Sequence, residues 1–493
     1  MRPFSGRAAA KFSAAQISPA RRIAFEVLRR VETENAYASD ALHAELGANI
    51  TAADAALATE ITFGTIRWQR LLDFLLERQM KKPGAKLDFA VRIALRAGLY
   101  QIRFLKRVPA HAAVGESVEM VKRARKVSAA GLVNAVLRRA AEDRTPAEQL
   151  LPSGVPLAER WGILHSHPTF LVERWLARWG EERTRALLEA NNRAPRLSCA
   201  IHGADSERRN TIESLERAGL HVEPGRLLRG AVAVSGGSPS RTEAFRHGRI
   251  SIQDEASQAV PLLLDVQAGE RVLDLCAAPG GKTATLERAA GERGMVVAAD
   301  RHAHRLSALQ AQLQRLGLRR ARLVELDAER PLPFGVTFDK ILVDAPCSGT
   351  GTLARHPEIR WRLEPEHLAE LHAIQTAMLV HAMDRLAPGG RLVYSTCSLE
   401  PEENEAVVQE ALAATNGDVD RIFATGISAR GRPPQTAPCA GASCVAQALA
   451  PHLAEGLEPN IFFDSAGDFR TSPGEQECDG FFAAVLERAA RKS

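Results

Sequence analysis

The sequence predicts a multidomain chain with an all-α N-terminal domain, a small α/β module, and a C-terminal α/β domain with a doubly wound, Rossmann-like sheet. Three observations lead to this prediction. Apolar residues recur at helical spacing, without strand alternation, over residues 18–143. Short strand patterns mix with one helical pattern over residues 157–245. Strands alternate with amphipathic helices over residues 250–490, which is typical of a parallel sheet.

The chain of 493 residues has the composition of an ordinary globular protein, with 45% hydrophobic and 25% charged residues. No apolar run is long enough to cross a membrane, and residues 1–17 lack the apolar segment of a signal peptide. We expect a disordered arm over residues 1–17 and a cytoplasmic, monomeric protein. The seven scattered cysteines fit a reducing compartment, and no spacing of Cys and His indicates a metal site.

Positive charge is concentrated in the first third of the chain. Residues 1–150 contain 25 Lys and Arg against 15 Asp and Glu, an excess of +10. Because the whole chain has a net charge of +5, the remainder carries about −5. This asymmetry suggests a polyanionic partner such as a nucleic acid, and a solvated basic surface is the alternative interpretation.

The first helix is expected to begin at Ser18 and Pro19, which suit an N-cap and a first helical position. Further helices are predicted over residues 51–76, 87–104, 112–126 and 129–141. Proline and glycine mark the breaks between them at residues 82–84 and 108–109.

Four strings in this helical region carry a resemblance to a known domain. They are Phe63-Gly64-Thr65-Ile66-Arg67-Trp68, Arg96-Ala97-Gly98-Leu99-Tyr100-Gln101-Ile102, Val108-Pro109-Ala110-His111-Ala112-Ala113-Val114 and Gly131-Leu132-Val133-Asn134-Ala135-Val136-Leu137-Arg138-Arg139. Together they resemble the NusB-type RNA-binding helical domain, and this implies RNA association but not catalysis. We expect Trp68 and Tyr100 to belong to the core and His111 to lie in a cap or turn.

The middle of the chain is a linker followed by the small module. Residues 143–156, rich in Pro, Ala and charge, are interpreted as the linker, and a helix is predicted over residues 168–192. The module then has predicted strands over residues 197–201 and 231–234, with a helix over residues 206–218 between them.

The C-terminal region alternates strands and helices. The predicted strands are residues 271–276, 295–299, 321–326, 339–344 and 390–395, and the predicted helices are residues 283–290, 302–316, 366–386 and 402–414. Ligands of doubly wound sheets bind beyond the carboxyl ends of the strands. We therefore look for the site among the residues that follow each strand.

The strand over residues 271–276 runs directly into a glycine turn and a helix, and this joint is predicted to hold a cofactor. The turn contains Cys276, Ala277, Ala278, Pro279, Gly280, Gly281 and Lys282. Gly281-Lys282-Thr283 ends like a phosphate-binding P-loop, but the first glycine of that motif would fall at Cys276. Pro279 also removes a backbone N–H that such a loop would donate.

A nucleoside cofactor without a phosphate chain fits better. Asp300 ends the second strand, where a carboxylate can bind ribose hydroxyls, and Asp327 ends the third, where a side chain can reach an adenine edge. The glycine pattern of a dinucleotide site is absent. S-adenosyl-L-methionine has the ribose, the base and the amino-acid end that these positions suit.

Two cysteines follow two later strands: Cys347 in Asp344-Ala345-Pro346-Cys347-Ser348-Gly349 and Cys397 in Ser395-Thr396-Cys397-Ser398. A single buried cysteine is usually a small hydrophobic residue, but two at the cofactor edge of one sheet indicate chemistry. Methylation of C5 of a pyrimidine requires such a thiolate, because addition to C6 makes C5 nucleophilic. Asp344 is placed to stabilise charge at N3 of the base.

These residues, with Arg355-His356-Pro357-Glu358-Ile359-Arg360-Trp361 and Asp479-Gly480-Phe481-Phe482, resemble the bacterial Sun/RsmB family of the NOL1/NOP2/Sun group. Members of this family are 16S rRNA (cytosine-C5)-methyltransferases. The resemblance implies that Cys397 attacks C6 and that Cys347 assists release of the methylated RNA. It also implies cofactor contacts, which are residues Cys276 to Lys282, Asp300, Arg305, Asp327 and Asp344.

We therefore expect methylation of one cytidine in 16S rRNA with S-adenosyl-L-methionine, the helical domain and the module positioning the RNA. Three alternatives stay open. They are another RNA substrate such as tRNA, a DNA cytosine methyltransferase with Cys347 as nucleophile, and a non-catalytic RNA-binding factor. Residues 416–460 match no motif and are interpreted as a variable surface insertion.

Overall fold

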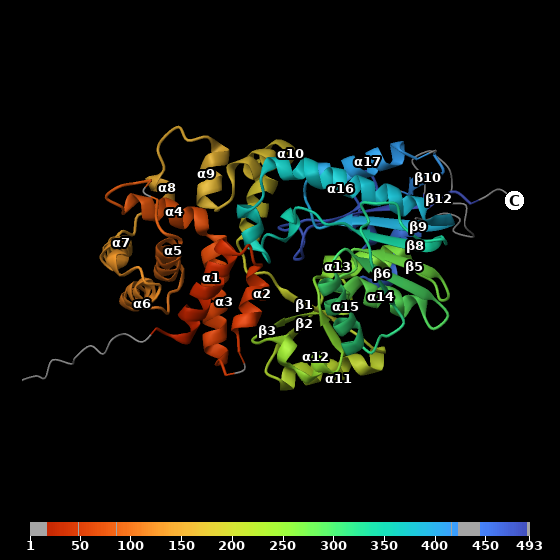
Figure 1. Ribbon diagram of the computed structural model, residues 1–493, viewed down its shortest axis with the longest axis horizontal. Coiled ribbons are helices and arrows are strands. Elements are labelled where there is room, and N and C mark those ends of the chain that lie inside the picture. Colours follow the sequence, from red (N-terminus) through yellow and green to blue (C-terminus); the bar gives the residue numbers. More distant parts are fainter. Residues whose placement is uncertain (1–16, 48, 85, 416, 423–443, 491–493) are drawn as a thin grey trace, which may run out of the picture. The chain divides into compact units, whose positions relative to one another are not determined.

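The computed structural model describes residues 17–47, 49–84, 86–415, 417–422 and 444–490 (Figure 1). The predicted arm over residues 1–17 lies outside these ranges except for its last residue. The chain forms two compact units. The N-terminal unit contains residues 1–192 and 356–361, and the C-terminal unit contains residues 193–355 and 362–493.

The N-terminal unit is all-α over its described residues, as the apolar spacing predicts. Its helices are α1 (Pro19–Thr33), α2 (Ala38–Glu45), α3 (Ala52–Arg67), α4 (Gln69–Arg78), α5 (Phe89–Phe104), α6 (Ala110–Arg123), α7 (Ala130–Glu142), α8 (Ala147–Leu150), α9 (Leu157–Leu164) and α10 (Thr169–Asn191). Helix α5 is central because Val91, Leu95 and Leu99 on it are buried against α4, α6 and α7. Tyr100 belongs to the core as predicted, and Trp68 is half-buried, packs against the same core and stacks on Phe104.

Two predicted helices are interrupted. The helix predicted over residues 51–76 is divided at Trp68, whose backbone leaves the helical region with φ −101° and ψ 15°. The helix predicted over residues 168–192 is divided at Gly180, which has φ 73° and ψ −176°. His111 is the second residue of α6 and is exposed, which agrees with the predicted place at a helix end.

The segment from His356 to Trp361 belongs to the N-terminal unit, where it binds three helix ends. Glu358 accepts a hydrogen bond from the backbone N–H of Ala38 at the start of α2, at 2.9 Å. The guanidinium of Arg360 is fully buried and donates to the carbonyls of Ser166, at 3.0 Å, and Asn191 at the end of α10, at 3.1 Å. The Trp361 indole donates to the Ile66 carbonyl of α3 at 2.8 Å. The charges of Glu358 and Arg360 match the dipoles of the helices that they cap.

The C-terminal unit begins with the small module, an antiparallel sheet in the order β2-β3-β1-β4. Its strands are β1 (Leu197–Ile201), β2 (His221–Pro224), β3 (Ala231–Ser235) and β4 (Ile250–Ile252), and α11 (Asp205–Arg217) follows β1. Strands β1 and β3 were predicted, whereas the short edge strands β2 and β4 were not. Leu215 of α11 packs with buried residues of β1, β3 and β4.

The larger sheet has the order β10-β12-β9-β8-β5-β6-β7, with β11 paired to β12. Its strands are β5 (Arg271–Leu275), β6 (Met295–Asp300), β7 (Arg322–Glu325), β8 (Phe338–Asp344), β9 (Leu386–Thr396), β10 (Val419–Ile422), β11 (Phe469–Thr471) and β12 (Phe481–Arg488). Strands β5 to β9 are parallel, as predicted. Strands β10, β11 and β12 form an antiparallel extension that was not predicted.

Helices cover both faces of this sheet (Figure 1). They are α14 (Gly281–Ala290), α15 (Ala303–Arg315) and α18 (Cys444–Leu449) on one face and α16 (Pro365–Asp384) and α17 (Glu405–Ala413) on the other. Alternate residues of each strand supply the two cores. Val272 of β5 faces the α14 side, and Leu273 and Leu275 face the α16 side. The fold class predicted from the sequence is therefore confirmed.

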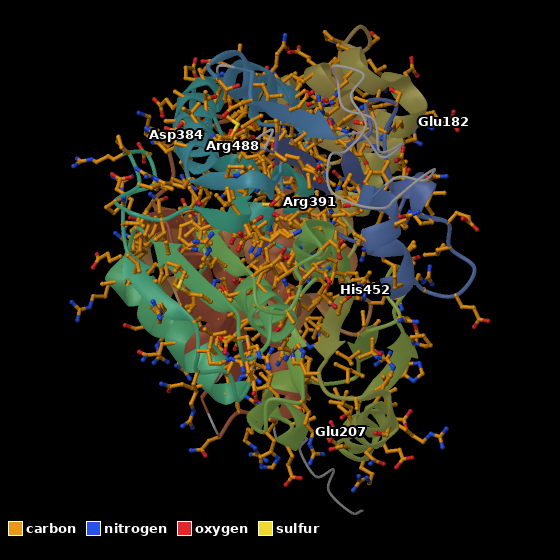
Figure 2. All side chains as sticks on the ribbon, turned by 90° about the vertical axis from the view of Figure 1, so that its right-hand side faces the viewer. Glu182, Glu207, Asp384, Arg391, His452 and Arg488 are labelled. Atoms are coloured by element: carbon orange, nitrogen blue, oxygen red, sulfur yellow. The ribbon has the colours of Figure 1, made fainter. Side chains whose placement is uncertain are left out.

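Where the antiparallel extension joins the parallel strands, Arg391 of β9, which is labelled in Figure 2, lies opposite Glu487 of β12 in the strand register. Its guanidinium donates twice to Glu487 Oε1, at 2.9 and 2.8 Å, and both side chains are largely buried. This cross-strand pair fixes the register between β9 and β12.

The interpretation of residues 416–460 as a surface insertion is wrong for its last part. Val445, Leu449 and Leu453 are buried against the α14 face of the large sheet, so this segment is part of the core. Residues 423–443, with Cys439, lie outside the described ranges. Among the residues that the structure describes, none of the helices combines the length and the hydropathy of a membrane-spanning segment.

Candidate active site

The topology of the large sheet defines where a ligand can bind. From β5 the chain builds β6 and β7 to one side, and then returns to build β8 and β9 on the other side. The direction of winding therefore reverses between β5 and β8. The carboxyl ends of these strands diverge at such a point, and ligands of open α/β sheets bind there.

The glycine turn joins β5 to α14 at this edge. Cys276 has φ 61° and Gly280, which immediately precedes α14, has φ 103°. A positive φ at Gly280 favours glycine, and the ideal Cβ position there would lie 3.1 Å from the side chain of Leu309. The turn thus brings its backbone and the start of α14 to the carboxyl edge of the sheet.

Lys282 and Asp344 form an ion pair between the regions after β5 and at the end of β8. The Lys282 ammonium lies 2.7 Å from Asp344 Oδ2 and donates to the Ser257 hydroxyl at 2.9 Å. The second oxygen of Asp344 accepts from the Ser395 hydroxyl at 2.8 Å. Two charged side chains are therefore fixed in orientation while remaining partly accessible.

Asp274 lies beneath this pair and was not among the predicted site residues. It is fully buried in β5, and its Oδ2 accepts a hydrogen bond from the Thr283 hydroxyl at 2.6 Å. Burial raises the pKa of Asp274 to about 7. The only signal in the sequence was a charged residue inside an apolar strand. Such a residue needs a hydrogen-bond partner, but the sequence does not show that the partner of Asp274 is Thr283.

Asp300 and Asp327 lie beside the glycine turn at the ends of β6 and β7. Asp300 is almost fully buried, and its Oδ2 faces the Arg305 guanidinium at 3.2 Å without a hydrogen bond. Arg305 also donates to the carbonyl of Ala278 in the turn, at 3.1 Å. Asp327 is half-buried and accepts from the backbone N–H of Glu329. A buried carboxylate oxygen with free capacity to accept suits a ribose hydroxyl, so these residues fit a nucleoside cofactor.

The two cysteines predicted at later strand ends lie together. Cys347 Sγ and Cys397 Sγ are 3.3 Å apart, and both residues are partly exposed. The hydrogen bond to Cys397 and burial raise the pKa of the Cys347 thiol well above its ordinary value. Either sulfur can donate in this S–H···S contact. The raised pKa disfavours the thiolate form of Cys347.

The turn that carries Cys397 is held from behind by Asn404. Its amide donates to the carbonyl of Ser398 at 2.9 Å and its oxygen accepts from the Thr396 hydroxyl. Asn404 has φ −113° and ψ −97°, so α17 begins at Glu405 and the predicted helix over residues 402–414 starts too early. Sequence reasoning did not identify Asn404 as part of the site.

The described residues contain no group of three or more His, Cys, Asp or Glu side chains arranged to hold a metal ion. The charged and nucleophilic groups at the strand ends are instead two thiols, one lysine and several carboxylates. Such a set supports nucleophilic addition and proton transfer.

Comparison with known families agrees with this arrangement. Residues 261–487 match the family described as 16S rRNA methyltransferase RsmB/F. Residues 18–142 match the NusB family, and residues 167–240 match the ferredoxin-like domain of RsmF/B-like methyltransferases.

Curated relatives are similar over most of their length. The probable ribosomal RNA small subunit methyltransferase B of Synechocystis sp. is 34% identical, over 80% of this chain and 89% of the relative. The protein of the same name from Bacillus subtilis is 32% identical, over 79% of this chain and 87% of the relative. The ribosomal RNA small subunit methyltransferase B of Pseudomonas syringae pv. tomato is 38% identical, over 74% of this chain and 80% of the relative.

Two solved structures share the fold. The crystal structure of PH0851 covers 97% of this chain and all of its own, with a TM-score of 0.75 at 24% identity. A methyltransferase homologue protein from Pyrococcus horikoshii covers 68% of this chain and 99% of its own, with a TM-score of 0.53 at 28% identity.

Proposed function

The chain belongs to the ribosomal RNA small subunit methyltransferase B family, and we propose that it methylates C5 of one specific cytidine in 16S rRNA. S-adenosyl-L-methionine is the methyl donor, and when bound it supplies the methyl group as an electrophile. In this proposal the cofactor is held by Cys276, Ala277, Ala278, Pro279, Gly280, Gly281, Lys282, Asp300, Arg305, Asp327 and Asp344. The buried, incompletely hydrogen-bonded Asp300 and the fixed glycine turn support that assignment.

Cys397 is the proposed nucleophile. Its thiolate adds to C6 of the cytosine, and the electrons of the C5–C6 double bond then make C5 able to attack the methyl group. Loss of the C5 proton to a base and departure of the Cys397 thiolate complete the reaction. The position of Cys347 Sγ, 3.3 Å from Cys397 Sγ, supports this division of roles, because the raised pKa of Cys347 disfavours the thiolate form of that side chain.

Cys347 and Asp344 have supporting roles in the proposal. Cys347 lies beside the sulfur–carbon bond that must break, so it assists release of the methylated RNA. Asp344, with one oxygen on Lys282 and the other on Ser395, is proposed to act at N3 of the base. Negative charge develops at N3 when the thiolate adds to C6, and the Lys282 ammonium that Asp344 holds supplies the positive charge that offsets it.

The RNA is proposed to be held by the NusB-like helical domain and the ferredoxin-like module, while the large sheet binds the cofactor and the flipped base. The basic excess of residues 1–150 supports an RNA partner for the N-terminal region. We propose a monomeric protein acting in the cytoplasm, with domains at residues 18–143, 157–245 and 250–490.

The observation that carries the proposal is the pair of sulfurs at the ends of adjacent parallel strands, next to the Lys282–Asp344 pair. Its test uses an unmodified 16S rRNA transcript, the methyl donor and bisulfite sequencing. Cys397→Ala should abolish methylation, by a factor of about a thousand or more, because the covalent step has no substitute nucleophile. Full activity of that variant contradicts the assignment of the nucleophile.

Cys347→Ala should instead accumulate a covalent enzyme–RNA adduct, seen as a band that survives denaturing electrophoresis. Loss of this adduct in the Cys347→Ala/Cys397→Ala double variant is the matched control. An adduct that requires Cys347 and forms without Cys397 would favour the DNA cytosine methyltransferase alternative, and duplex DNA serves as the competing substrate.

The same purified protein distinguishes the proposed function from two further alternatives. Replacing the 16S rRNA transcript with tRNA tests the other RNA substrate. Isothermal titration with S-adenosyl-L-methionine tests the non-catalytic alternative, because a protein without a functional methyl-donor site releases no heat of binding.

A further inference from the structure

Glu403 is a buried carboxylate immediately behind the two cysteines, and the mechanism above gives it no role. It ends the short 3₁₀ turn Pro401–Glu403 that precedes α17 and is fully shielded from solvent. A buried charge is costly unless every oxygen is hydrogen-bonded. Its partners therefore show what the carboxylate is for.

Four donors surround Glu403, three from the two cysteine-bearing turns and one from α16. Oε1 accepts from the backbone N–H of Ser348, at 2.7 Å, and from the Gln375 amide, at 3.0 Å. Oε2 accepts from the hydroxyls of Ser348 and Ser398. Ser348 directly follows Cys347 and Ser398 directly follows Cys397. One carboxylate thus binds the residue after each reactive sulfur.

Gln375 extends the same connection to the other side of Cys347. Its amide also donates to the carbonyl of Pro346, the residue before Cys347, at 2.8 Å. The residue before Cys347 is therefore held by Gln375 of α16, and the residue after Cys347 is held by Glu403.

On the premise of the proposed function, we infer that Glu403 is a positioning residue that joins the two cysteine-bearing turns and so sets the geometry of the two sulfurs. Burial raises the pKa of Glu403, and the hydrogen bonds from Ser348, Ser398 and Gln375 act in the opposite direction. The four donors fill the four acceptor sites of the ionised carboxylate and so stabilise its negative charge. That charge disfavours a thiolate at Cys347, because like charges repel in a buried site. The groups that act on Cys347 are Cys397, Glu403 and the backbone N–H of Gly349. Tyr394 of β9 also lies near, because Cys347 contributes to the raised pKa of that phenol.

The test compares Glu403→Gln, which keeps the shape and removes the charge, with Glu403→Asp, which keeps the charge on a side chain one carbon shorter. Glu410→Gln is the matched control, because Glu410 is exposed on α17 and pairs with His372. Each protein is treated with iodoacetamide over a range of pH, and alkylation of each cysteine is followed by mass spectrometry. This readout needs no methylation activity.

For Glu403→Gln we expect the alkylation profile of Cys347 to move to lower pH, with at least about a threefold faster reaction at a fixed pH, which is half a pKa unit. Glu403→Asp should leave that profile close to wild type, since the charge remains. Both variants should lose kcat by about tenfold or more with KM for RNA unchanged, because Glu403 acts on the sulfurs and not on the RNA. Glu410→Gln should match wild type throughout.

The inference is overturned if Glu403→Gln leaves the Cys347 profile and kcat unchanged, or if it lowers only the melting temperature. Should Glu403→Gln fail to fold, Glu403→Asp carries the test, and unchanged kcat in that variant overturns the positioning role. A shifted Cys347 profile in a protein that methylates no cytidine would refute the proposed function and leave the role of Glu403 at the cysteines intact.

Discussion

Gly351 brings the two cysteine-bearing turns into contact. Its backbone N–H donates to the Cys397 carbonyl at 2.9 Å, and its carbonyl accepts from the N–H of Gly480 at 2.8 Å. A side chain has no room here, because the ideal Cβ position lies 2.1 Å from the Gly480 oxygen and 2.8 Å from the Cys397 oxygen. The spacing of the two sulfurs therefore depends on a glycine that carries no reactive group.

Gly351→Ala should displace the Cys397 turn, destabilise the protein by about 1–3 kcal/mol and reduce methylation by about tenfold or more. The backbone atoms that the new methyl group meets belong to paired segments and cannot rotate away. Thermal melting and initial methylation rates measure the two effects. Gly335→Ala is the control, since no atom lies within 4 Å of its ideal Cβ, and equal behaviour of the two variants would contradict the steric argument.

The sequence predicted that the proposed site residues lie together at one edge of the sheet, whereas the residues that hold them in place could not be predicted from it. Cys347, Cys397, Asp344 and Lys282 come together because parallel strands end at one edge, and this rule needs only the strand ends. Glu403 acts through side-chain contacts with residues 55 and 5 positions away in the chain. No periodicity encodes contacts of this kind, so they became visible only in three dimensions.

At the level of elements, the C-terminal segments complete the second face of the large sheet. Helix α18 packs on the apolar turn over residues 260–264 and places Leu449 in the core, fully shielded from solvent. Ile461, twelve residues later, is 55% exposed. The two aliphatic side chains differ in burial within one short segment, which makes them a matched pair.

Leu449→Ala should lower the free energy of unfolding of the C-terminal unit by about 2–5 kcal/mol, because it leaves a cavity beside the sheet. Ile461→Ala should change it by less than about 0.5 kcal/mol. Urea denaturation of the two variants, followed by circular dichroism, makes the comparison. Similar losses in both variants would show that the segment does not pack as the structure has it.

Whether a strand could be predicted from the sequence depended on how regular its residue pattern is. The five parallel strands are apolar runs between helices of ordinary length, and each of them was found. Strand β10 lies within the stretch without periodicity over residues 416–460, and β11 and β12 follow that stretch. Strands β2 and β4 are edge strands of four and three residues. Short edge strands depend on pairing with a neighbour more than on local pattern, so they were missed.

At the level of the whole molecule, the N-terminal unit is discontinuous in sequence. It is completed by residues 356–361, which cap α2 and α10 and bind α3 through Glu358, Arg360 and Trp361. Trp361 also packs against a small core that includes Leu28, Ile66 and Ile93. Residues 1–192 by themselves would leave these helix ends and this core exposed.

A fragment of residues 1–192 fused through a Gly/Ser linker to residues 356–361 should melt at least about 4 °C higher than residues 1–192 alone, since the peptide restores buried hydrogen bonds and apolar contacts. The same fusion with Arg360→Ala and Trp361→Ala is the control and should give no increase. Identical melting temperatures for all three proteins would show that the segment contributes no stability to the unit. Differential scanning calorimetry provides the measurement.

The discontinuity also determines when the N-terminal unit can be finished during translation. The ribosome must add residues 193–355 after α10 before the completing segment is made. At about 5–20 residues per second, this interval lasts on the order of 8–33 s. Throughout this interval, the start of α2 and the end of α10 lack the hydrogen-bond partners that Glu358 and Arg360 supply in the folded protein.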